Sequence, residues 1–190
     1  SSLTMQNKKN DIMKSILIKF VVILLLAINL QAEDRIKVLS LSGYWKFSIG
    51  DNNGWKNANF NDSNWEDIKV PAFWEDRGYH GYDGYAWYRK QFIIPDKYLN
   101  AQLYLELGYI DDVDETYLNG VLIGKSGAFP PNYTTSYYSY RKYPIPAGLL
   151  KPGNNVISIR VYDDEQGGGI VNGEIGIYNY KNINLLVGLE

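Results

Sequence analysis

From residue 36 onward, apolar positions recur along the chain in short runs with a period of two. The segments that alternate in this way are 43–49, 85–94, 101–107, 115–124, 155–162 and 174–180. Pro95, Pro152-Gly153 and the glycines at 167–169 separate the runs. Short alternating runs between turn residues predict β-strands, and no window of a dozen residues keeps the 3.6-residue period of a helix. The pattern therefore predicts an all-β sandwich.

A different pattern precedes the strands. Lys19 comes before an uninterrupted apolar run over 20–28, and Ala32 supplies a small residue before charge returns. This layout is typical of a secretory signal peptide, with cleavage near Ala32. The alternative, a membrane anchor, needs about 20 apolar residues, and Lys19 interrupts the run too early for that. We expect an upstream extension and signal peptide over 1–32 and one domain over 33–190, located in the periplasm, at the cell surface or outside the cell.

Charge and cysteine content narrow the range of partners. Residues 33–190 carry 15 basic and 20 acidic side chains, because residues 1–32 hold four of the lysines and one aspartate. Such a domain lacks the basic patch that nucleic acid requires, so we expect no nucleic-acid partner, and no membrane span in the mature chain. Cysteine is absent, which excludes disulfides and thiolate chemistry.

Aromatic side chains gather in two long loops, 71–84 and 127–146, where they alternate with charged residues. All 17 tyrosines and all 5 tryptophans of the chain follow Ala32. Rings with an apolar face and a polar tip suit core packing, and they also suit a surface that stacks on sugars. Loops on a rigid sandwich are where binding residues tend to lie.

The stretch 111–120, DDVDETYLNG, places four carboxylates in five positions before Asn119-Gly120. An Asn-Gly pair between apolar runs predicts a tight hairpin with positive φ at both residues. The acids before it could accept hydrogen bonds from turn amides or pair with Arg89 or Arg141. We favour this structural role, because acidic residues near turns often serve backbone donors.

Two chemical roles for the same acids stay open. Asp112 and Asp114 would lie about 6.6 Å apart on one face of a strand, near the spacing of inverting glycosidases. Alternatively, the acids of this stretch could hold a structural calcium ion, as could 51–53 or Asp163-Asp164, although the EF-hand spacing is absent.

His80 is the only histidine. Any Ser-His-Asp triad would have to use it, and no G-x-S-x-G segment supplies a nucleophile. No carboxylate lies at a telling interval for a histidine metal site. We expect His80 to be a surface loop residue that could contact a ligand.

Several blocks of sequence occur in an order that resembles a known family. They are LSGYWKFSIGDNNGW, FNDSNWEDIKVPAFWE, YDGYAWYRKQFIIP, IDDVDETYLNGVLIG and YRKYPIPAGLLKPGNNVISIRVYD, followed by GGGI. Together they resemble, over about residues 39–170, the sugar-binding jelly-roll domain of glycoside hydrolase family 2, which is galactose-binding-domain-like. The form found within sialate O-acetylesterases is similar. The resemblance implies a jelly-roll β-sandwich without catalytic machinery, because both enzyme families keep their catalytic residues in a separate domain.

The resemblance also implies roles for single residues. Asn119 matches an asparagine that reaches toward the sugar in some β-galactosidases. Arg89 and Arg141 match recurrent positions and are expected to neutralise the acids at 111–115. Of Trp87 and Tyr88, one is expected to face the core. Tryptophans of this fold, Trp74 included, pack in the core or at an edge more often than they bind ligands.

We therefore expect a secreted, non-catalytic carbohydrate-binding or accessory β-sandwich that binds an oligo- or polysaccharide and accompanies a catalytic hydrolase domain. The expected ligand contacts are Trp74, Tyr79, His80, Tyr82, Asp83, Asn119, Tyr133, Tyr137 and Arg141. No cofactor is expected apart from a structural calcium ion. The alternatives are a protein-interaction or sensor module that docks a hydrolase or signalling partner, and an enzyme in its own right that uses Asp112 with Asp114 or Glu115.

Overall fold

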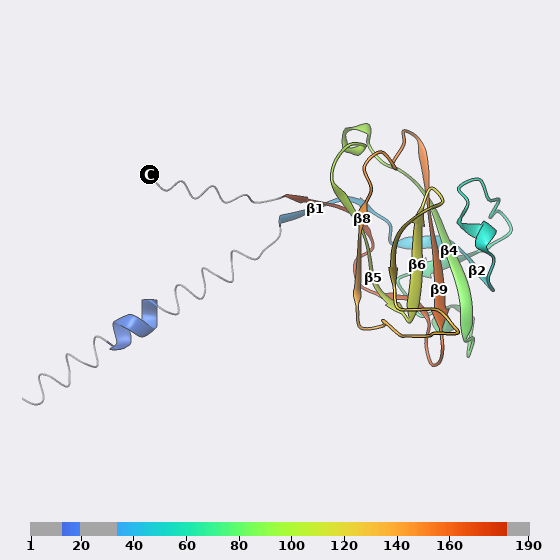
Figure 1. The fold of residues 1–190 in the computed structure, drawn as a ribbon, viewed down its shortest axis with the longest axis horizontal. Coiled ribbons are helices and arrows are strands. Elements are labelled where there is room, and N and C mark those ends of the chain that lie inside the picture. Colours follow the sequence, from blue (N-terminus) through green and yellow to red (C-terminus); the bar gives the residue numbers. More distant parts are fainter. Residues whose placement is uncertain (1–12, 20–33, 182–190) are drawn as a thin grey trace, which may run out of the picture. The chain divides into compact units, whose positions relative to one another are not determined.

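A computed structural model of the protein describes residues 13–19 and 34–181 (Figure 1). Residues 13–19 form a short helix, and residues 34–181 form two packed β-sheets. The apolar run at 20–28 and the expected cleavage site near Ala32 lie outside the described residues. Within the described ranges, no helix is long and apolar enough to cross a membrane.

The strands form two layers that face each other (Figure 1). One sheet contains β1 (Asp34–Ser40), β5 (Leu103–Asp111), β8 (Tyr140–Ile145), β10 (Gly169–Asn172) and β11 (Gly176–Lys181). The other has the order β3-β2-β4-β9-β6-β7 and contains β2 (Gly43–Ile49), β3 (Glu66–Val70), β4 (Gly84–Ile93), β6 (Val113–Leu118), β7 (Val121–Ser126) and β9 (Asn154–Asp163). The short 3₁₀ helices are η1 (Asn53–Lys56), η2 (Glu75–Arg77) and η3 (Asp96–Tyr98). The predicted all-β sandwich is confirmed.

Strands with strong alternation match the prediction, and weakly alternating ones do not. Residues 43–49 form β2 as predicted, and 115–124 divides at the Asn119-Gly120 turn into β6 and β7. β8 lies within 127–146, which was predicted to be a loop. Its sequence, YRKYPI, includes a proline and charged residues, so its strand conformation follows from its pairing with β5 and not from its own pattern.

Aromatic and branched apolar side chains fill the space between the sheets. Phe47 on β2 contacts Tyr88 on β4, with ring centroids 4.8 Å apart, and both are almost completely buried. The expectation that one of Trp87 and Tyr88 faces the core is met by Tyr88, which belongs to the core cluster. Trp87 is buried as well, because Trp55 and Tyr117 cover it, at 6.2 and 6.0 Å between ring centroids.

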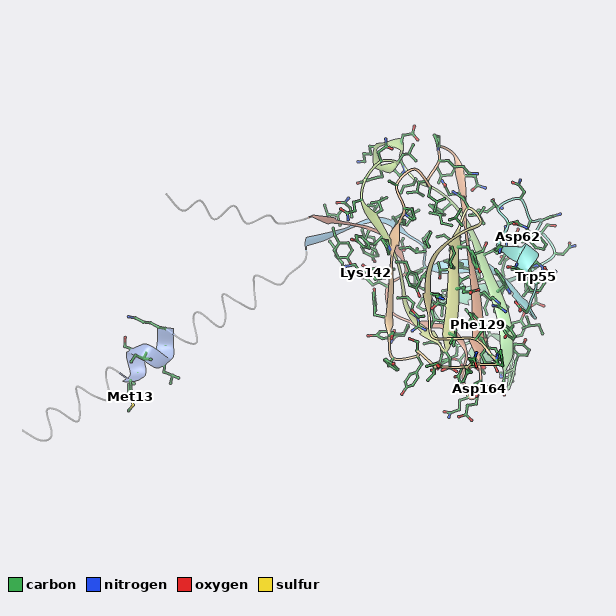
Figure 2. The ribbon with its side chains drawn as sticks, in the orientation of Figure 1. Met13, Trp55, Asp62, Phe129, Lys142 and Asp164 are labelled. Atoms are coloured by element: carbon green, nitrogen blue, oxygen red, sulfur yellow. The ribbon has the colours of Figure 1, made fainter. Side chains whose placement is uncertain are left out.

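Arg89 fastens the segment 51–62 onto the second sheet. Its Nε donates to Asp62 at 2.8 Å, and its Nη1 donates to the Ser158 hydroxyl at 2.8 Å and to the Asn57 carbonyl at 3.1 Å. Figure 2 shows Trp55 and Asp62 together on this side of the sandwich. The expectation that Arg89 neutralises the acids at 111–115 is therefore wrong, because Arg89 pairs with a nearer carboxylate of the covering segment.

Gly108 allows β5 to pass close to the turn after β10. Its φ is +65°, and a Cβ there would stand 2.0 Å from the Asn172 carbonyl oxygen. Gly148 has a similar φ of +75°, but a Cβ there would meet no atom within 4 Å. Both glycines therefore require a positive φ, but only Gly108 lacks room for a Cβ atom.

We expect Gly108→Ala to lower the free energy of unfolding by about 3 kcal/mol or more, because strain and backbone overlap add together. Gly148→Ala, the matched control, is expected to lower it by only about 1 kcal/mol, from strain alone. Urea unfolding of both variants measures the difference, and equal losses would contradict the overlap at Gly108.

Candidate functional site

A pocket of about 480 Å³ opens at one end of the sandwich. Its walls come from the junction of β5 and β6, the loop before β8 and the turn after β9. The residues that line it are Asp111, Asp112, Tyr133, Thr135, Tyr137, Asp164, Glu165 and Gln166. Asp164 and Phe129 lie together at this end, the lower one in the view of Figure 2.

A buried ion pair positions two of these walls. Arg141 on β8 and Asp114 on β6 are both fully buried, and the Arg141 Nε donates to Asp114 Oδ1 at 2.9 Å. Tyr143 and Thr116 also donate their hydroxyls to Asp114, each at 2.9 Å from Oδ2. The predicted pairing of Arg141 with an acid of the stretch 111–115 is confirmed.

The remaining nitrogens of Arg141 donate hydrogen bonds to backbone carbonyls. Its Nη1 donates to the carbonyls of Ser136 and Ser139, each at 2.5 Å, and its Nη2 donates to the carbonyl of Asp112 at 2.9 Å. The first two carbonyls belong to the loop that carries Tyr133 and Tyr137, and the third lies at the floor of the pocket. One guanidinium group therefore sets the position of the loop relative to the floor.

Asp112 extends this connection through its side chain. Its Oδ1 accepts a hydrogen bond from the Thr135 hydroxyl, and its Oδ2 accepts one from the Asp164 amide at 3.2 Å. Burial acts to raise the pKa of Asp112, but hydrogen bonds from Thr135, Tyr133 and the Asp164 amide outweigh it, so this pKa lies below its usual range. Asp112 is therefore ionised near neutral pH.

Two further carboxyl groups lie beside Asp112. One carboxylate oxygen each of Asp111, Asp112 and Asp163 lies within 4.8 Å of the other two. Burial and the charge of Asp112 raise the pKa of Asp163 to about 8, and burial and a hydrogen bond with Asp112 raise that of Asp111 to about 7. Asp163 is fully buried, and neither of its carboxylate oxygens has a hydrogen-bond partner among the described residues.

Aromatic rings border the pocket. Tyr133, which lines it, lies against Tyr162 with ring centroids 5.6 Å apart. Tyr162 contacts Tyr85 at 4.8 Å, and Tyr85 stacks on Phe129 at 5.8 Å and 7° between the ring planes. The Arg160 guanidinium lies against both of these rings, at 4.2 Å from the Phe129 centroid and 4.8 Å from the Tyr85 centroid. Because these rings pack on one another, Tyr133 has a rigid support.

A second hollow, of about 300 Å³, adjoins the pocket. It is lined by Phe73, Glu75, Asp76, Asp111, Gln166 and Gly167, so Asp111 and Gln166 border both hollows. Glu75 is held there because its carboxylate accepts a hydrogen bond from the Gly168 amide at 3.2 Å.

Six of the nine sequence-based ligand contacts divide into three groups. Tyr133 and Tyr137 line the pocket. His80 and Asp83 are exposed in the loop 71–83 but do not line it. Tyr79 and Tyr82 are half-buried and pack against the core.

The prediction that Trp74 and Arg141 contact a ligand is wrong. Trp74 is fully buried, and its indole nitrogen donates to the Tyr82 carbonyl at 3.0 Å, so the ring has no exposed face on which a sugar could stack. Arg141 is fully buried as well, and backbone carbonyls and Asp114 take up its donors. Neither side chain can contact a ligand, because neither reaches the surface.

Asn119 lies outside the pocket. It forms the predicted tight turn with Gly120, at φ values of +51° and +87°. Its amide nitrogen donates to the Leu149 carbonyl and to Asn155 Oδ1, both at 2.9 Å, and its Oδ1 accepts from the Val156 amide at 3.0 Å. Asn119 also lies at the end of β6 opposite Asp112, about 20 Å away along the strand. Its side chain serves the hairpin and not the pocket.

Several residues that line the pocket were not among the predicted ligand contacts. They are Asp111, Asp112, Thr135, Asp164, Glu165 and Gln166. For Asp112 the sequence favoured a structural role, with catalysis or calcium binding as alternatives, and for Asp163-Asp164 it offered calcium binding. One signal in the sequence could have indicated them: Asp111-Asp112 and Asp163-Asp164 each stand at the end of a strand. That the two pairs meet depends on the topology, which places β5 and β9 in facing sheets.

A family model described as the beta-galactosidase second all-beta domain matches residues 50–167, more than half of the chain. The chain belongs to this family. A curated relative, a putative beta-glucuronidase of Formosa agariphila, is 28% identical over 152 residues, which are 73% of this chain and 14% of that protein. The chain thus spans about one seventh of this relative. The predicted resemblance to a domain of glycoside hydrolase family 2 is confirmed, and the similarity to sialate O-acetylesterases stays a prediction.

Solved structures share the fold of this all-beta domain. A beta-glucuronidase of Bacteroides uniformis superposes with a TM-score of 0.63 at 22% identity, over 76% of this chain and 18% of that one. A glycosyl hydrolase family 2 member of Bacteroides cellulosilyticus superposes with a TM-score of 0.62 at 20% identity, over 77% and 21% of the two chains. In both, the matching part is a minor portion of the whole protein.

We expect Arg141→Met to lower the free energy of unfolding by about 3–5 kcal/mol, because Asp114 would remain buried without its cation. Arg160→Met is the matched control: Arg160 pairs with Asp51 near the surface, so about 1 kcal/mol is expected. Denaturant unfolding compares them, and a small loss for Arg141→Met would contradict its central position.

Asn119→Gly preserves the left-handed backbone but removes all three side-chain hydrogen bonds. We expect a loss of about 2 kcal/mol in unfolding free energy, measured by thermal and urea unfolding. Asn64→Gly, at an exposed loop position, is the control for the added backbone entropy and is expected to cost about 1 kcal/mol or less. Equal losses would show that the Asn119 side chain contributes nothing to the hairpin.

Proposed function

We propose that this all-beta domain is a non-catalytic accessory domain of a glycoside hydrolase and that it binds carbohydrate in the pocket at the end of the sandwich. The observation that carries the proposal is the lining itself: carboxylates and tyrosine rings gather in one hollow of about 480 Å³. Family membership supports the link to carbohydrate, because the matched family is described from a beta-galactosidase.

The lining suits the hydroxyl groups of a sugar. Carboxylate oxygens of Asp164 and Glu165 are exposed and accept hydrogen bonds, which sugar hydroxyls donate. Tyr137 is 57% exposed and Tyr133 is half-buried, so their rings offer apolar faces beside these acceptors. A concave site with convergent polar groups is typical of a small polar ligand, and this concavity favours a sugar over a flat protein surface.

The charge of the lining favours a neutral sugar. Asp111, Asp112, Asp164 and Glu165 are acidic, and the lining contains no lysine, arginine or histidine. A uronate carboxylate would meet the like charge of Asp164 and Glu165 at the rim, with no cationic side chain in the lining to pair with it. The relatives are named beta-glucuronidases, so we propose that uronate recognition, where it occurs, belongs to another part of such a protein.

The same geometry supports an accessory role. Asp114 is fully buried in its ion pair with Arg141, and Glu115 accepts the Tyr117 hydroxyl at 2.9 Å and pairs with Arg160 at 3.4 Å. A general acid or base must be within reach of substrate, and Asp114 is closed off from it. We propose that catalytic groups lie in the larger part of the relatives that this chain does not span.

Export of the protein is part of the proposal. Its support is the basic segment, the apolar run over 20–28 and the small residue Ala32. Expression in a bacterial host with N-terminal sequencing of the periplasmic product tests it. A mature chain that begins after Ala32 is the expected result, and retention of residues 13–32 in the product would contradict it.

Glycan arrays that carry neutral and glucuronate-containing oligosaccharides test the ligand class, followed by calorimetric titration of the strongest binder. We expect binding of a neutral oligosaccharide, and Tyr137→Ala to weaken it by about tenfold, or about 1.4 kcal/mol, because a stacking face is lost. Tyr138→Ala is the matched control, since Tyr138 is 69% exposed but does not line the pocket.

Three results would count against the proposed function. They are an absence of binding on the arrays, a preference for uronates over neutral sugars, and equal losses for Tyr137→Ala and Tyr138→Ala.

A further inference from the structure

We propose that Asp111, Asp112 and Asp163 form a calcium-binding site that joins the two sheets beneath the pocket. The ion would bind whether or not the pocket takes a carbohydrate, so the inference goes beyond the proposed function. It rests on where the three carboxyl groups lie, on the missing partners of Asp163 and on the chemistry of calcium.

Rigid backbone holds the three groups. Asp111 ends β5 and pairs with Gly169 of β10, and Asp163 ends β9 and pairs with Gly84 of β4. Asp112 links β5 to β6, and its amide donates to the Tyr162 carbonyl at 3.0 Å. Because β5 and β9 belong to different sheets, the carboxylate oxygens converge from both layers, and no backbone rearrangement is needed to bring them together.

Asp163 is the residue that points to a ligand. Both of its carboxylate oxygens are buried and lack a hydrogen-bond partner among the described residues. Buried polar groups are almost always hydrogen-bonded, and buried charges are paired or coordinate a metal. Asp112, in contrast, has donors from Thr135 and the Asp164 amide. A cation at the centre of the cluster would supply what Asp163 lacks.

The spacing and the donor atoms suit calcium. Calcium binds oxygen ligands at about 2.3–2.6 Å, so two oxygens on opposite sides of one ion stand about 4.6–5.2 Å apart. Here, three oxygens, one from each carboxyl group, lie within 4.8 Å of one another. Magnesium demands a tighter octahedral geometry and usually keeps several waters, whereas a cage of three carboxylates from rigid strands is typical of calcium.

The site has a route to solvent. Asp111 lines both the main pocket and the adjoining hollow, so an ion can enter beside it, and water molecules in either hollow can complete the coordination shell. The bound charge would also offset the repulsion among the three carboxylates. Since Asp112 also accepts the Thr135 hydroxyl, the ion would steady the loop that carries Tyr133 and Tyr137.

Calcium titration of the full chain after dialysis against EDTA tests the site, with Tb³⁺ luminescence sensitised by nearby tyrosines as a second readout. We expect the wild type to bind Ca²⁺ with a dissociation constant of about 10⁻⁴–10⁻³ M or tighter, the range of extracellular calcium modules. The melting temperature in excess Ca²⁺ is expected to exceed that in EDTA by about 5 °C or more.

Asp163→Asn separates metal binding from folding. It removes a ligand and a buried carboxyl group that has no hydrogen-bond partner among the described residues, so we expect at least a tenfold loss of Ca²⁺ affinity, while the melting temperature in EDTA stays equal to that of the wild type or rises. Asp111→Asn is expected to behave in the same way. Asp96→Asn is the matched control, because Asp96 is exposed in η3, far from the cluster along β4, and should bind Ca²⁺ as the wild type does.

Three results would overturn the assignment. One is a wild-type melting temperature that is the same in Ca²⁺ and in EDTA, which would show that Asp163 is instead buried in its protonated form. The second is wild-type Ca²⁺ affinity in Asp163→Asn. The third is equal stabilisation by Mg²⁺ at the same concentration, which would contradict the calcium-type geometry.

Discussion

The ion pair between Arg141 and Asp114 is the interaction on which the pocket depends. Both side chains are fully buried, and removal of two charges from water is costly unless every donor and acceptor finds a partner. The structure meets this condition: Asp114 accepts from Arg141, Tyr143 and Thr116, and the other nitrogens of Arg141 take three backbone carbonyls. A loop without regular secondary structure thereby acquires a fixed position against the sheet.

Arg89 does the same for another segment. It holds residues 51–62 against the outer face of the second sheet through Asp62, Ser158 and backbone carbonyls. Under this cover Trp87 becomes buried on the face away from the core. The guanidinium groups on β4 and β8 are thus both used as internal fasteners, because a planar group with several donors can bind several carbonyls at once. Neither arginine is available to a ligand.

Carboxyl groups are concentrated at one end of the sandwich. Asp111, Asp112 and Asp163 converge where the chain passes between the sheets, and Asp164 and Glu165 extend the acidic surface to the rim of the pocket. An acid cluster with one carboxylate unpartnered is unfavourable by itself. The proposed cation beneath the pocket would offset this cost, and it would leave the exposed acids of the rim to accept hydrogen bonds from the proposed neutral ligand.

The local sequence was sufficient to predict the strands and turns whose conformation depends on neighbouring residues alone. Period-two alternation predicted β2, β4, β6 and β9, since alternate side chains of a strand face opposite sides, and Asn119-Gly120 predicted a turn that only residues tolerant of positive φ can make. The order of the family blocks predicted the jelly-roll relationship. Charged β8 and short β10 were not predicted, because their conformation comes from pairing with β5 and not from their own residues.

Tertiary structure decided which of the conspicuous residues face solvent. Trp74, Asn119 and Arg141 are residue types that often contact ligands. In this structure Trp74 packs in the core, the Asn119 amide bonds within the hairpin, and Arg141 forms a buried ion pair. Asp111 and Asp163 lie 52 positions apart in the sequence and meet only because the two sheets face each other. The sequence alone established an acidic, aromatic-rich β-sandwich; the location of its pocket followed from burial and long-range packing, which no local pattern encodes.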